Sequence, residues 1–586
     1  MNLIDHWKAE AAKKLSAVTE TTIEGNELTR APDPKLGDFA FGCFKLAKEQ
    51  KTNPTELAQS IASKVTIEQS DFASVSAEGP YVNFTLSIPH CVHRVVEEIE
   101  TSKEAFTESN SGEGKELVLE YAQPNTHKVI HVGHLRNFLI GAALDRVLTH
   151  VGWQVVPVSY FGDVGAHVAK CLWHLTKSRG FDISSFSLTD VEKLLATIPA
   201  EKKTGEYLGE IYAESTQKMD ESPEGKEEVS FVLQKLEAHD PAWEKLWLET
   251  RRWSLNEMKE VFDELGVHFK KQYLESEVVT RGQELVDDLL EKGIAKKSEG
   301  AIIVDLEEKK LGVFLVRKSD GTSLYATKDL ALAEEKLKDY PNAERSLILV
   351  DSRQSHYFKQ LFATLGMMDV KPIPEFIGYE FVTLKSGAMS SREGNIVSYK
   401  ELRDQVLAYA RTEIEKRHVN EWSEGKITHT AWCIAMSGMK FSMLKQDNDK
   451  IFTFDLEQAL SFEGATGPYC QYAATRLSSI LKKAEQKIDS NSELPFSFDH
   501  EPEKRLALIL AELPSKIETA AAELRPSVIG QWCLETAQRV NDFYRDVPVL
   551  KTEGEERVAR MRLVAAAHTV LESGLALLGI PLPDEM

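Results

Sequence analysis

One stretch of this sequence constrains the fold more than any other, because it places a strand, a turn and a helix in direct succession. Residues 117–121 have the hydrophobic pattern of a strand, and residues 138–147 have a helical pattern. The turn between them contains His131, Gly133 and His134. Free backbone N–H groups and the helix dipole both face such a turn, which makes it a natural anion site. The stretch therefore predicts a nucleotide site where two histidines donate to phosphate oxygens.

A surface helix that begins with two solvated histidines would show the same short motif, so the rest of the chain has to decide. After this first strand, strand patterns alternate with helical ones, which is typical of a parallel sheet. We expect strands at 155–160, 301–305 and 313–316, and a buried parallel strand at 346–350. Residues 187–265 are helical and rich in Glu and Lys, so we expect an insertion without chemistry of its own.

The two ends of the chain differ from this middle part. Residues 1–112 combine helical patterns with an alternating strand at 79–86, which predicts an α+β unit followed by a polar linker. Residues 399–586 are almost wholly helical in pattern. The sequence thus predicts a multidomain protein, α/β plus all-α, with its central domain at 115–398.

Composition excludes some classes of protein. No run of 18 apolar residues occurs, so we expect no membrane span. The N-terminal residues are mixed in charge and lack the pattern of a secretory signal or transit peptide, so the cytoplasm is the expected compartment. The six cysteines are scattered without a Cys-x-x-Cys pair, so we expect reduced thiols and no zinc. The net charge of −22 is weak evidence against nucleic acid, since an acidic protein can carry a local basic track.

A second chemical cluster lies at 387–395, a polar loop of small residues that includes Met389, Ser390 and Arg392. A loop that brings a cation and hydroxyls to the phosphates from the opposite side suits nucleotidyl transfer. In that reaction charge builds up on the α-phosphorus and on the departing pyrophosphate. A plain surface loop explains these residues equally well when they are taken alone.

Taken together, the two clusters resemble the paired motifs of class I aminoacyl-tRNA synthetases, and the whole chain resembles arginyl-tRNA synthetases. Residues 124–136 match that family's motif Pro-Asn-x-x-Lys-x-x-His-x-Gly-His-x-Arg at every fixed position, and 389–395 are similar to its second motif. Further matches lie at 319–329, 354–358, 462–473 and 577–586.

The resemblance implies a Rossmann-type catalytic domain with a helical insertion, an N-terminal domain that touches the tRNA elbow and a helical anticodon-binding domain. It also implies a two-step reaction. The carboxylate of L-arginine attacks the α-phosphate of ATP, and the terminal 2′-OH of tRNA(Arg) then takes the arginyl group. Mg²⁺ accompanies ATP, the family favours a monomer, and its members usually need bound tRNA to activate arginine.

In this resemblance, His131, His134 and Lys128 hold the ATP phosphates, and Gly133 lies under the adenine. The catalytic set also includes the loop residues Met389, Ser390 and Arg392. The second motif departs from the family pattern, because Ala388 and Ser391 stand where lysines are expected. Lys128 matches the lysine thought to substitute for them, and Arg392 or Lys385 are candidates to share the task.

A site that selects a guanidinium needs a carboxylate at fork geometry and neutral acceptors. Asp329 and Tyr325, four residues apart on one expected helix face, supply a carboxylate and a hydroxyl. Asn125, Gln354 and His134 match positions that hold the α-amino and carboxylate groups. Glu120 is a further anionic candidate, with a strand-end salt bridge as the alternative. The resemblance implies this arginine set: Glu120, Gln123, Pro124, Asn125, His134, Tyr325, Asp329 and Gln354.

The tRNA contacts implied by the resemblance are Asp38, Phe39, Tyr469, Gln471, Tyr472, Arg476 and Met586. Trp532 and Tyr544 are further aromatic candidates for stacking on unpaired bases. The alternative for the aromatic residues is that they belong to the core, as aromatic residues at helical spacing usually do.

Three other functions remain as alternatives. A cysteinyl-tRNA synthetase would hold its substrate on zinc, which the scattered cysteines disfavour. A nucleotidyltransferase acting on a small metabolite shares His-x-Gly-His but lacks a long helical C-terminal domain. A tRNA-binding paralogue without catalysis would fit the altered second motif and is disfavoured by the intact His131, His134, Lys128, Asp329 and Gln354.

Overall fold

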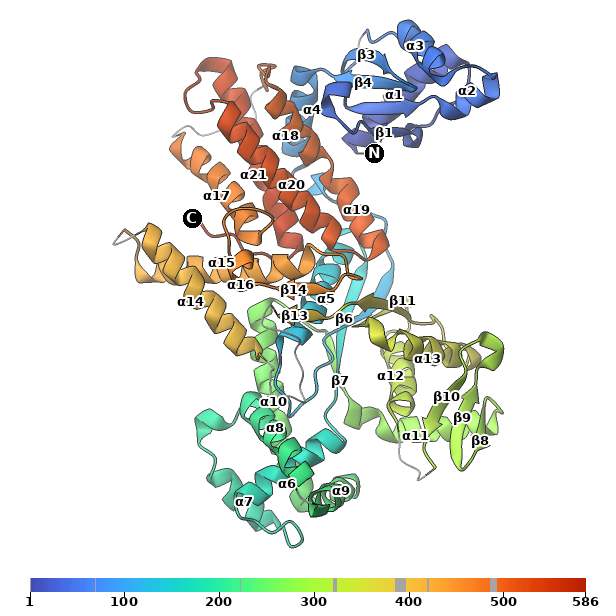
Figure 1. Cartoon of the computed structure of the whole chain (residues 1–586), viewed down its shortest axis with the longest axis vertical. Helices are drawn as coiled ribbons and strands as arrows, with labels where there is room; N and C mark the ends of the chain where they lie inside the picture. The colour runs from blue at the N-terminus through green and yellow to red at the C-terminus, as the bar shows by residue number, and fades with distance from the viewer. Residues whose placement is uncertain are drawn as a thin grey trace.

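The computed structural model describes residues 2–68, 70–221, 223–319, 324–384, 397–418, 421–484 and 493–586. Figure 1 shows an elongated molecule with the N-terminal unit and the C-terminal helices at one end. A parallel sheet occupies the middle, and two smaller bodies lie at the other end, one helical and one built around a small sheet. No helix in these described ranges has the length and apolar character that crossing a membrane requires.

The central sheet is parallel and five-stranded, as the alternating pattern predicts. Its order is β12 (Glu375–Tyr379), β11 (Ala343–Asp351), β5 (Glu116–Glu120), β6 (Gln154–Phe161) and β7 (Lys271–Leu274). Helices α5 (Val132–His150) and α13 (Ser355–Met367) follow β5 and β11. In a sheet of this kind ligands bind beyond the carboxyl ends of the strands, which positions the site.

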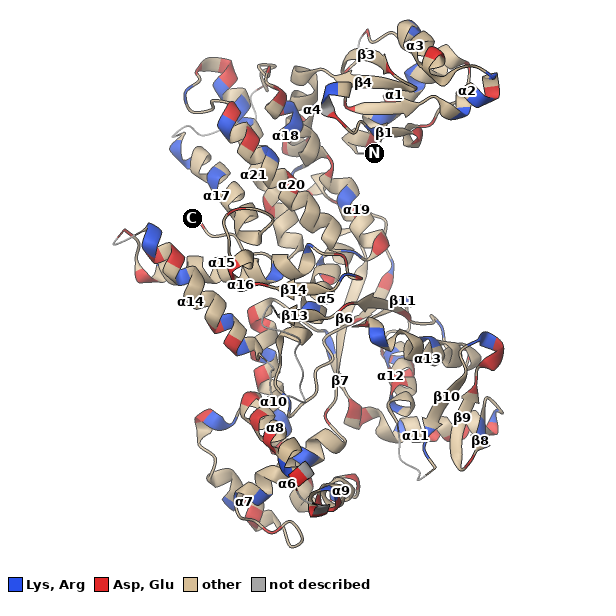
Figure 2. Ribbon diagram, in the orientation of Figure 1, with Lys and Arg blue, Asp and Glu red and all other residues tan. Residues whose placement is uncertain are grey.

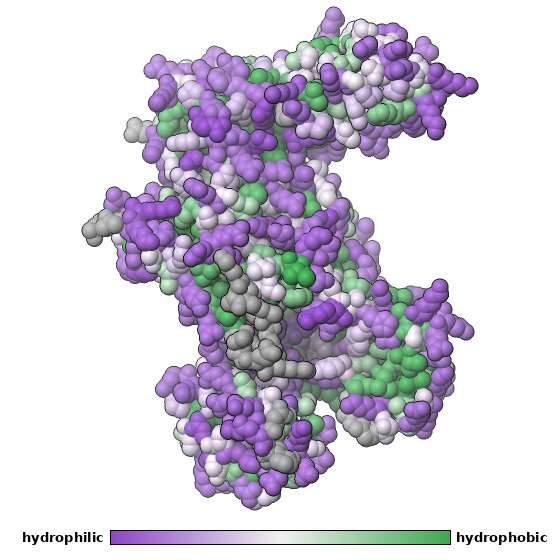
Figure 3. All heavy atoms as spheres, in the orientation of Figure 1, coloured by the Kyte–Doolittle hydropathy of each residue, from purple (hydrophilic) through white to green (hydrophobic). Residues whose placement is uncertain are grey.

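The strands expected at 301–305 and 313–316 form, but they do not join this sheet. They are β9 (Ala301–Asp305) and β10 (Val313–Arg317), which pair antiparallel with each other and with β8 (Ala295–Ser298). The seven residues between β9 and β10 suffice for a hairpin, whereas a parallel crossover needs a dozen or more. Helices α11 (Glu275–Glu291) and α12 (Tyr325–Asp339) flank this small sheet. Figure 3 shows apolar side chains gathered on this body, where Val313 and Leu315 of β10 are exposed.

The helical insertion is larger than the sequence predicts. It begins before residue 187 with α6, and its helices share a hydrophobic core that includes Leu172 and Trp243. The helices are α6 (Ala166–Ser178), α7 (Leu188–Ala196), α8 (Gly205–Glu221), α9 (Pro223–Glu237) and α10 (Pro241–Leu265).

The N-terminal unit is an antiparallel sheet covered by helices, with Trp7, Phe39 and Phe84 buried in its core. The sheet has the order β1 (Leu28–Arg30), β2 (Phe39–Gly42), β4 (Tyr81–Leu86) and β3 (Phe72–Glu78). Its helices are α1 (Leu3–Thr19), α2 (Phe44–Gln50), α3 (Pro54–Lys64) and α4 (Ile88–Ser102).

The C-terminal region is helical apart from β14 (Phe452–Phe454), which pairs in parallel with β13 (Val382–Leu384). Figure 2 shows both signs of charge interspersed along its outer helices. The helices are α14 (Tyr399–Arg417), α15 (Glu424–Leu444), α16 (Leu456–Ala459), α17 (Gly467–Lys483), α18 (Glu501–Ala511), α19 (Leu513–Glu523), α20 (Ser527–Asp546) and α21 (Gly554–Leu577).

Buried charged side chains join these regions. Arg136 of α5 is fully buried and donates to the carbonyls of Glu380 at 2.7 Å, Asp447 at 2.9 Å and Lys450 at 2.6 Å. At the other end of the molecule Lys504 of α18 lies 3.2 Å from the buried carboxylate of Asp38. A buried ion pair of this kind is costly to break, so it fixes how the N-terminal unit sits on the helices.

Candidate active site

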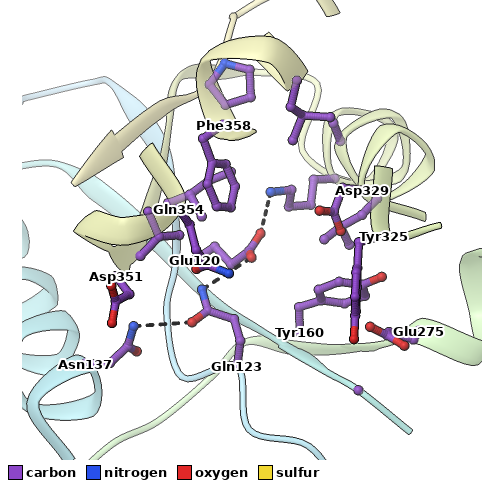
Figure 4. Close-up of a pocket in the computed structure, with 18 of the residues that line it drawn as sticks. Glu120, Gln123, Asn137, Tyr160, Glu275, Tyr325, Asp329, Asp351, Gln354 and Phe358 are labelled. Atoms are coloured by element: carbon purple, nitrogen blue, oxygen red, sulfur yellow. Dashed lines mark hydrogen bonds and ion pairs between the residues drawn. The ribbon is translucent and has the colours of Figure 1, made fainter. Parts of the chain in front are cut away.

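A cavity of about 420 Å³ lies beyond the carboxyl ends of β5, β6 and β11. Figure 4 shows side chains from these strands and from α12 and α13 converging on it. Its walls include eight residues that matter below: Glu120, Asn125, His134, Tyr160, Glu275, Tyr325, Asp329 and Gln354. The cavity therefore gathers segments that lie far apart in the sequence.

One end of the cavity is formed by the first turn of α5, which begins at Val132 rather than near residue 138. His131 is the N-cap, and its Nδ1 accepts the Gly133 N–H at 3.1 Å. The backbone N–H of His131 in turn donates to Nδ1 of His134 at 3.2 Å. The two imidazole rings stack with their centroids 3.8 Å apart. Both histidines therefore act in the helix cap, and His134 also lines the cavity.

This cap decides which ring nitrogen carries the proton. Because Nδ1 of each ring accepts a backbone N–H, the proton of each neutral imidazole lies on Nε2. Burial, and then the nearby Lys128, lowers the pKa of His131 to about 4. Burial, and then His131, holds the pKa of His134 well below its usual value. The first turn of α5 thus offers two neutral N–H donors at a helix N-terminus, which suits an anion.

The turn that precedes α5 is held by backbone contacts with the end of β6. The N–H of Thr126 donates to the carbonyl of Gly162 at 2.9 Å, and the N–H of Gly162 donates to the carbonyl of Pro124 at 3.3 Å. A Cβ atom on Gly162 would lie 2.0 Å from Oδ1 of Asn125, so any other residue there would displace the Asn125 side chain from its place in the cavity wall. Pro124 is buried and does not line the cavity, whereas Asn125 does.

The helical insertion packs against the same turn, so it supports the site from outside the cavity. His127 is fully buried, and its Nε2 lies 2.8 Å from the hydroxyl of Thr250 in α10. The ammonium of Lys128 lies over the ring of Tyr212 in α8, 5.1 Å from its centroid. Gly209 of α8 packs so closely that a Cβ atom would lie 2.7 Å from the backbone nitrogen of Val129.

The other end of the cavity is rich in carboxylates. Glu120 is buried and accepts a hydrogen bond from Lys336 at 2.6 Å. It therefore forms a salt bridge at the end of a strand and is also part of the cavity wall. Glu275 accepts from Lys328 at 2.6 Å. The remaining acidic lining residue besides Asp329 is Asp351, which binds Arg353.

Asp329 differs from these three, because its hydrogen bond in this structure comes from a neutral group, the hydroxyl of Tyr357. Burial, together with Glu120 and Glu275, raises the pKa of Asp329 to about 7, against the opposing effect of the Tyr357 hydrogen bond. A cation that enters the cavity would remove this penalty by pairing with the carboxylate. Among the described residues, the acidic end therefore has one carboxylate, that of Asp329, which is not paired with a cation.

Three other residues that are expected to bind the substrate arginine occupy distinct places. Gln123 is held by its neighbours, since its amide donates to the carbonyl of Leu349 at 3.2 Å and accepts from Asn137 at 3.3 Å. Tyr325 begins α12 and is 68% exposed, so its ring stands at the cavity mouth. Gln354 immediately precedes α13 and lines the wall.

Sequence reasoning missed four residues of this site: Tyr160, Glu275, Lys336 and Tyr357. Tyr160 lies near the carboxyl end of β6, and the carboxyl ends of parallel strands meet at one edge of the sheet. Its position in the sequence could therefore have predicted a place in the site. The other three lie on helices whose packing no local pattern reveals. Met389, Ser390 and Arg392 lie outside the described residues.

Asp38 and Phe39, two of the residues expected to contact tRNA, are interior residues in this structure. The carboxylate of Asp38 accepts the Leu86 N–H at 2.7 Å and pairs with Lys504, while Phe39 is 2% exposed. Gln471 is also fully buried and donates to the carbonyl of Cys433. The carboxylate of Asp38 is thus satisfied inside the fold, whereas Oε1 of Gln471 has no hydrogen-bond partner among the described residues.

A different group stays at the surface of the helical region. The guanidinium of Arg476 lies between the rings of Tyr472 and Tyr544, 4.5 and 4.3 Å from their centroids. Tyr544 is half exposed, and Tyr469 and Met586 are partly buried. Trp532 is buried and donates to the carbonyl of Ile509, so it belongs to the core.

Comparison with known families gives three matches along the chain. Residues 5–86 match the arginyl-tRNA synthetase N-terminal domain. Residues 95–456 match the catalytic domain of class I tRNA synthetases of the arginine type. Residues 470–586 match the DALR anticodon-binding domain.

Full-length relatives agree with these matches. The chain is 35% identical to the arginine–tRNA ligase of Bdellovibrio bacteriovorus, covering 95% of this chain and 94% of the relative. It is 32% identical to that of Lactobacillus johnsonii, covering 95% and 96%. The fold resembles the arginyl-tRNA synthetase of Thermus thermophilus, with a TM-score of 0.74 and 24% identity, covering 99% of this chain and 100% of that one. It also resembles the arginyl-tRNA synthetase of Plasmodium falciparum, with a TM-score of 0.73 and 18% identity, covering 98% of this chain and 99% of that one. This chain therefore belongs to the arginyl-tRNA synthetase family of class I tRNA synthetases.

Proposed function

We propose that this chain is an arginine–tRNA ligase that converts ATP, L-arginine and tRNA(Arg) into arginyl-tRNA(Arg), AMP and diphosphate. The observation that carries this proposal is the polarity of the cavity. Neutral N–H donors at a helix N-terminus form one end, and a carboxylate without a cationic partner in this structure lies at the other. A triphosphate and a guanidinium need these two environments side by side.

In the first step, the guanidinium of arginine pairs with Asp329, while Asn125, Gln354 and His134 hold the α-amino and carboxylate groups. Tyr325 closes the mouth of the site, and Glu120, Gln123 and Pro124 shape its floor and the turn above it. The substrate carboxylate then attacks the α-phosphorus of ATP, and diphosphate leaves.

His131 and His134 donate from Nε2 to the phosphates, where charge grows in the transition state. Gly133 lies under the adenine, and Lys128 moves from Tyr212 to the phosphates as a point charge. Met389, Ser390 and Arg392 remain proposed contributors from the second motif. Mg²⁺ would accompany ATP and would neutralise charge on the phosphates. Glu120, Glu275 and Asp351 each bind a cation of the protein, and Asp329 is assigned to the guanidinium, so we assign Mg²⁺ no protein ligand.

In the second step the terminal 2′-OH of tRNA(Arg) takes the arginyl group. The stacked group of Tyr472, Arg476 and Tyr544, with Tyr469 and Met586, is the surface we propose for unpaired anticodon bases. The proposed domains are 1–112, 115–398 and 399–586, and we expect a monomer in the cytoplasm.

Pyrophosphate exchange into ATP, measured with each of the twenty amino acids, with and without total tRNA, tests the proposal. We expect exchange with arginine alone and only when tRNA is present. Exchange with arginine in the absence of tRNA would keep the function and remove the tRNA requirement. Exchange with another amino acid would overturn the Asp329 pocket, and no exchange at all would favour a tRNA-binding protein without catalysis.

A further inference from the structure

Among the described residues that line the cavity, one buried hydroxyl lacks a partner. Tyr160 of β6 is 8% exposed, and its hydroxyl has no hydrogen-bond partner among the described residues. Buried hydroxyls in folded proteins are nearly always hydrogen-bonded, because an unpaired one loses its hydration without compensation. An unpaired hydroxyl in the wall of a substrate cavity therefore points to a bond that forms when the substrate binds.

The surroundings of this hydroxyl define what it can bind. Figure 4 shows Tyr160 on the same side of the cavity as Tyr325, Asp329 and Glu275. Burial, and then the charges of Asp329 and Glu275, raises the pKa of Tyr160 well above its usual value, so the group stays a neutral phenol. A neutral phenol beside carboxylates can accept a hydrogen bond from a cationic donor and give its own proton to a carboxylate.

A guanidinium is the ligand that uses such a hydroxyl best. It carries five N–H donors in one plane, so a carboxylate such as Asp329 can bind one edge while a neutral acceptor binds another. A lysine ammonium also satisfies a carboxylate, so the carboxylate alone discriminates poorly between the two amino acids. A second acceptor at a fixed position adds a contact that depends on the shape of the cation.

The other tyrosines near the cavity are less suited to this task. Tyr325 is 68% exposed and stands at the mouth, beside the ammonium of Lys328. The hydroxyl of Tyr357 is already bound to Asp329, and the hydroxyl of the lining residue Tyr379 is hydrogen-bonded to Asn137. Tyr160 is therefore the buried tyrosine among the described lining residues whose hydroxyl is free for a substrate.

The position of Glu275 beside Tyr160 is fixed independently of any substrate. Asp163, two residues beyond β6, is fully buried and accepts the Ser276 N–H at 2.9 Å and the Ser276 hydroxyl at 2.7 Å. Arg251 of the insertion donates to the same carboxylate at 2.8 Å. These contacts hold the first turn of α11, so the acidic wall around the free hydroxyl is preformed.

We propose that the hydroxyl of Tyr160 binds the guanidinium of the substrate and is a specificity-determining residue for arginine. The inference rests on the proposed function and adds to it a residue that the arginine motifs do not contain. It predicts that the hydroxyl contributes to binding of the amino acid, whereas ATP is held at the other end of the cavity and is not affected.

The test is Tyr160→Phe, which removes one oxygen and keeps the ring. The loss of a hydrogen bond to a charged group should raise the KM for arginine about 10- to 100-fold in pyrophosphate exchange. The KM for ATP should stay within about twofold. Inhibition by lysine should change less than the arginine KM, so that discrimination between the two falls about tenfold.

Tyr273→Phe is the matched control. Tyr273 lies directly opposite Tyr160 on the neighbouring strand, and its hydroxyl donates to Asp339 at 2.7 Å, outside the cavity lining. The control should keep the arginine KM within about twofold. Melting temperatures separate binding from folding. Tyr160→Phe removes an unpaired buried group, so its Tm without substrate should be unchanged or higher, and arginine should stabilise it less than the wild type.

Each outcome has one meaning. An unchanged arginine KM in Tyr160→Phe, with active wild type, would overturn this inference and leave the proposed function standing. A fall in Tm without substrate would show that the hydroxyl has a structural partner, which also overturns it. Wild-type protein that exchanges no pyrophosphate with arginine would overturn the proposed function and this inference with it.

Discussion

The two ends of the cavity solve opposite electrostatic problems in different ways. At the histidine end, His131 and His134 are neutral, and backbone N–H groups fix their ring nitrogens. At the acidic end, charges are abundant and are mostly paired inside the protein, as in Glu120 with Lys336 and Glu275 with Lys328. The histidine end can bind an anion without a change in its own charge, whereas Asp329 at the acidic end is stabilised only when a cation binds.

This difference teaches which end should control selectivity. Neutral donors at a helix N-terminus bind many phosphates without a change in protonation, so they favour anions as a class. A buried carboxylate whose pKa is raised to about 7 is held in an unfavourable state until a matching cation arrives. We expect the acidic end to decide the amino acid and the histidine end to drive the chemical step.

The largest expected effect belongs to Asp329→Ala. Removing the carboxylate leaves the guanidinium without its charged partner, a loss of about 3–5 kcal/mol, or about a thousandfold in kcat/KM for arginine. ATP binding, measured by equilibrium dialysis, should remain. Equal loss of arginine and ATP binding would break the division of labour between the two ends.

The next effect separates the two tasks of His131. His131→Asn keeps an N-cap that accepts the Gly133 N–H, but it has no Nε2 donor. We expect kcat for exchange to fall about a hundredfold while Tm stays close to wild type. His131→Ala should lose the same activity and about 1 kcal/mol of stability in addition. Normal kcat in the asparagine variant would mean that His131 only caps the helix.

A smaller effect is the pH dependence of arginine binding. Arginine needs the ionised form of Asp329, so the KM for arginine should fall about tenfold as pH rises from 6 to 8. The KM for ATP should stay flat over this range, since the pKa values of His131 and His134 are lowered far from it. If the KM values for arginine and for ATP changed equally with pH, the proposed difference between the two ends of the cavity would be wrong.

The same carboxyl group has an effect on stability with the opposite sign. Its pKa is raised in the folded state, so its favourable contribution to the free energy of unfolding is fully present below about pH 4, near the pKa of an unfolded aspartate. This contribution is lost as the pH rises through about 7. Asp329→Asn should remove this part of the pH dependence in urea unfolding of the protein without substrate.

The smallest expected effect concerns the insertion. Gly209→Ala adds a methyl group against Val129, and overpacking of this kind costs about 1–3 kcal/mol, part of which reaches the turn before α5. We expect the KM for ATP to rise about threefold and the KM for arginine to rise less. Gly425→Ala, which meets no atom within 4 Å, is the matched control and should leave both unchanged.

Much of the architecture could be predicted from local patterns. The apolar run at 346–350 and the segment at 117–121 do form neighbouring parallel strands, because buried parallel strands need continuous hydrophobic residues. The same patterns could not assign β9 and β10 to a second sheet, since strand periodicity does not name the partner. The early start of α5 was missed because a histidine cap is not among the usual Ser, Thr, Asp and Asn signals.

The site was predictable where a motif carries it and unpredictable where long-range packing does. Asn125, His134 and Asp329 were found by motif and do line one cavity. Lys336 and Tyr357 act through contacts with other elements, which no local spacing reveals. The burial of Asp38 could not be predicted for the same reason, because its partner Lys504 is 466 residues away.

That pair has a consequence for how the molecule can measure a bound RNA. Separating Asp38 from Lys504 would leave an uncompensated buried charge, at a cost of about 3–5 kcal/mol. The N-terminal sheet is therefore expected to move together with α18 as one rigid body. The span between it and the proposed anticodon surface of Tyr472, Arg476 and Tyr544 is then set by the protein, and we expect an RNA that meets both to match this span.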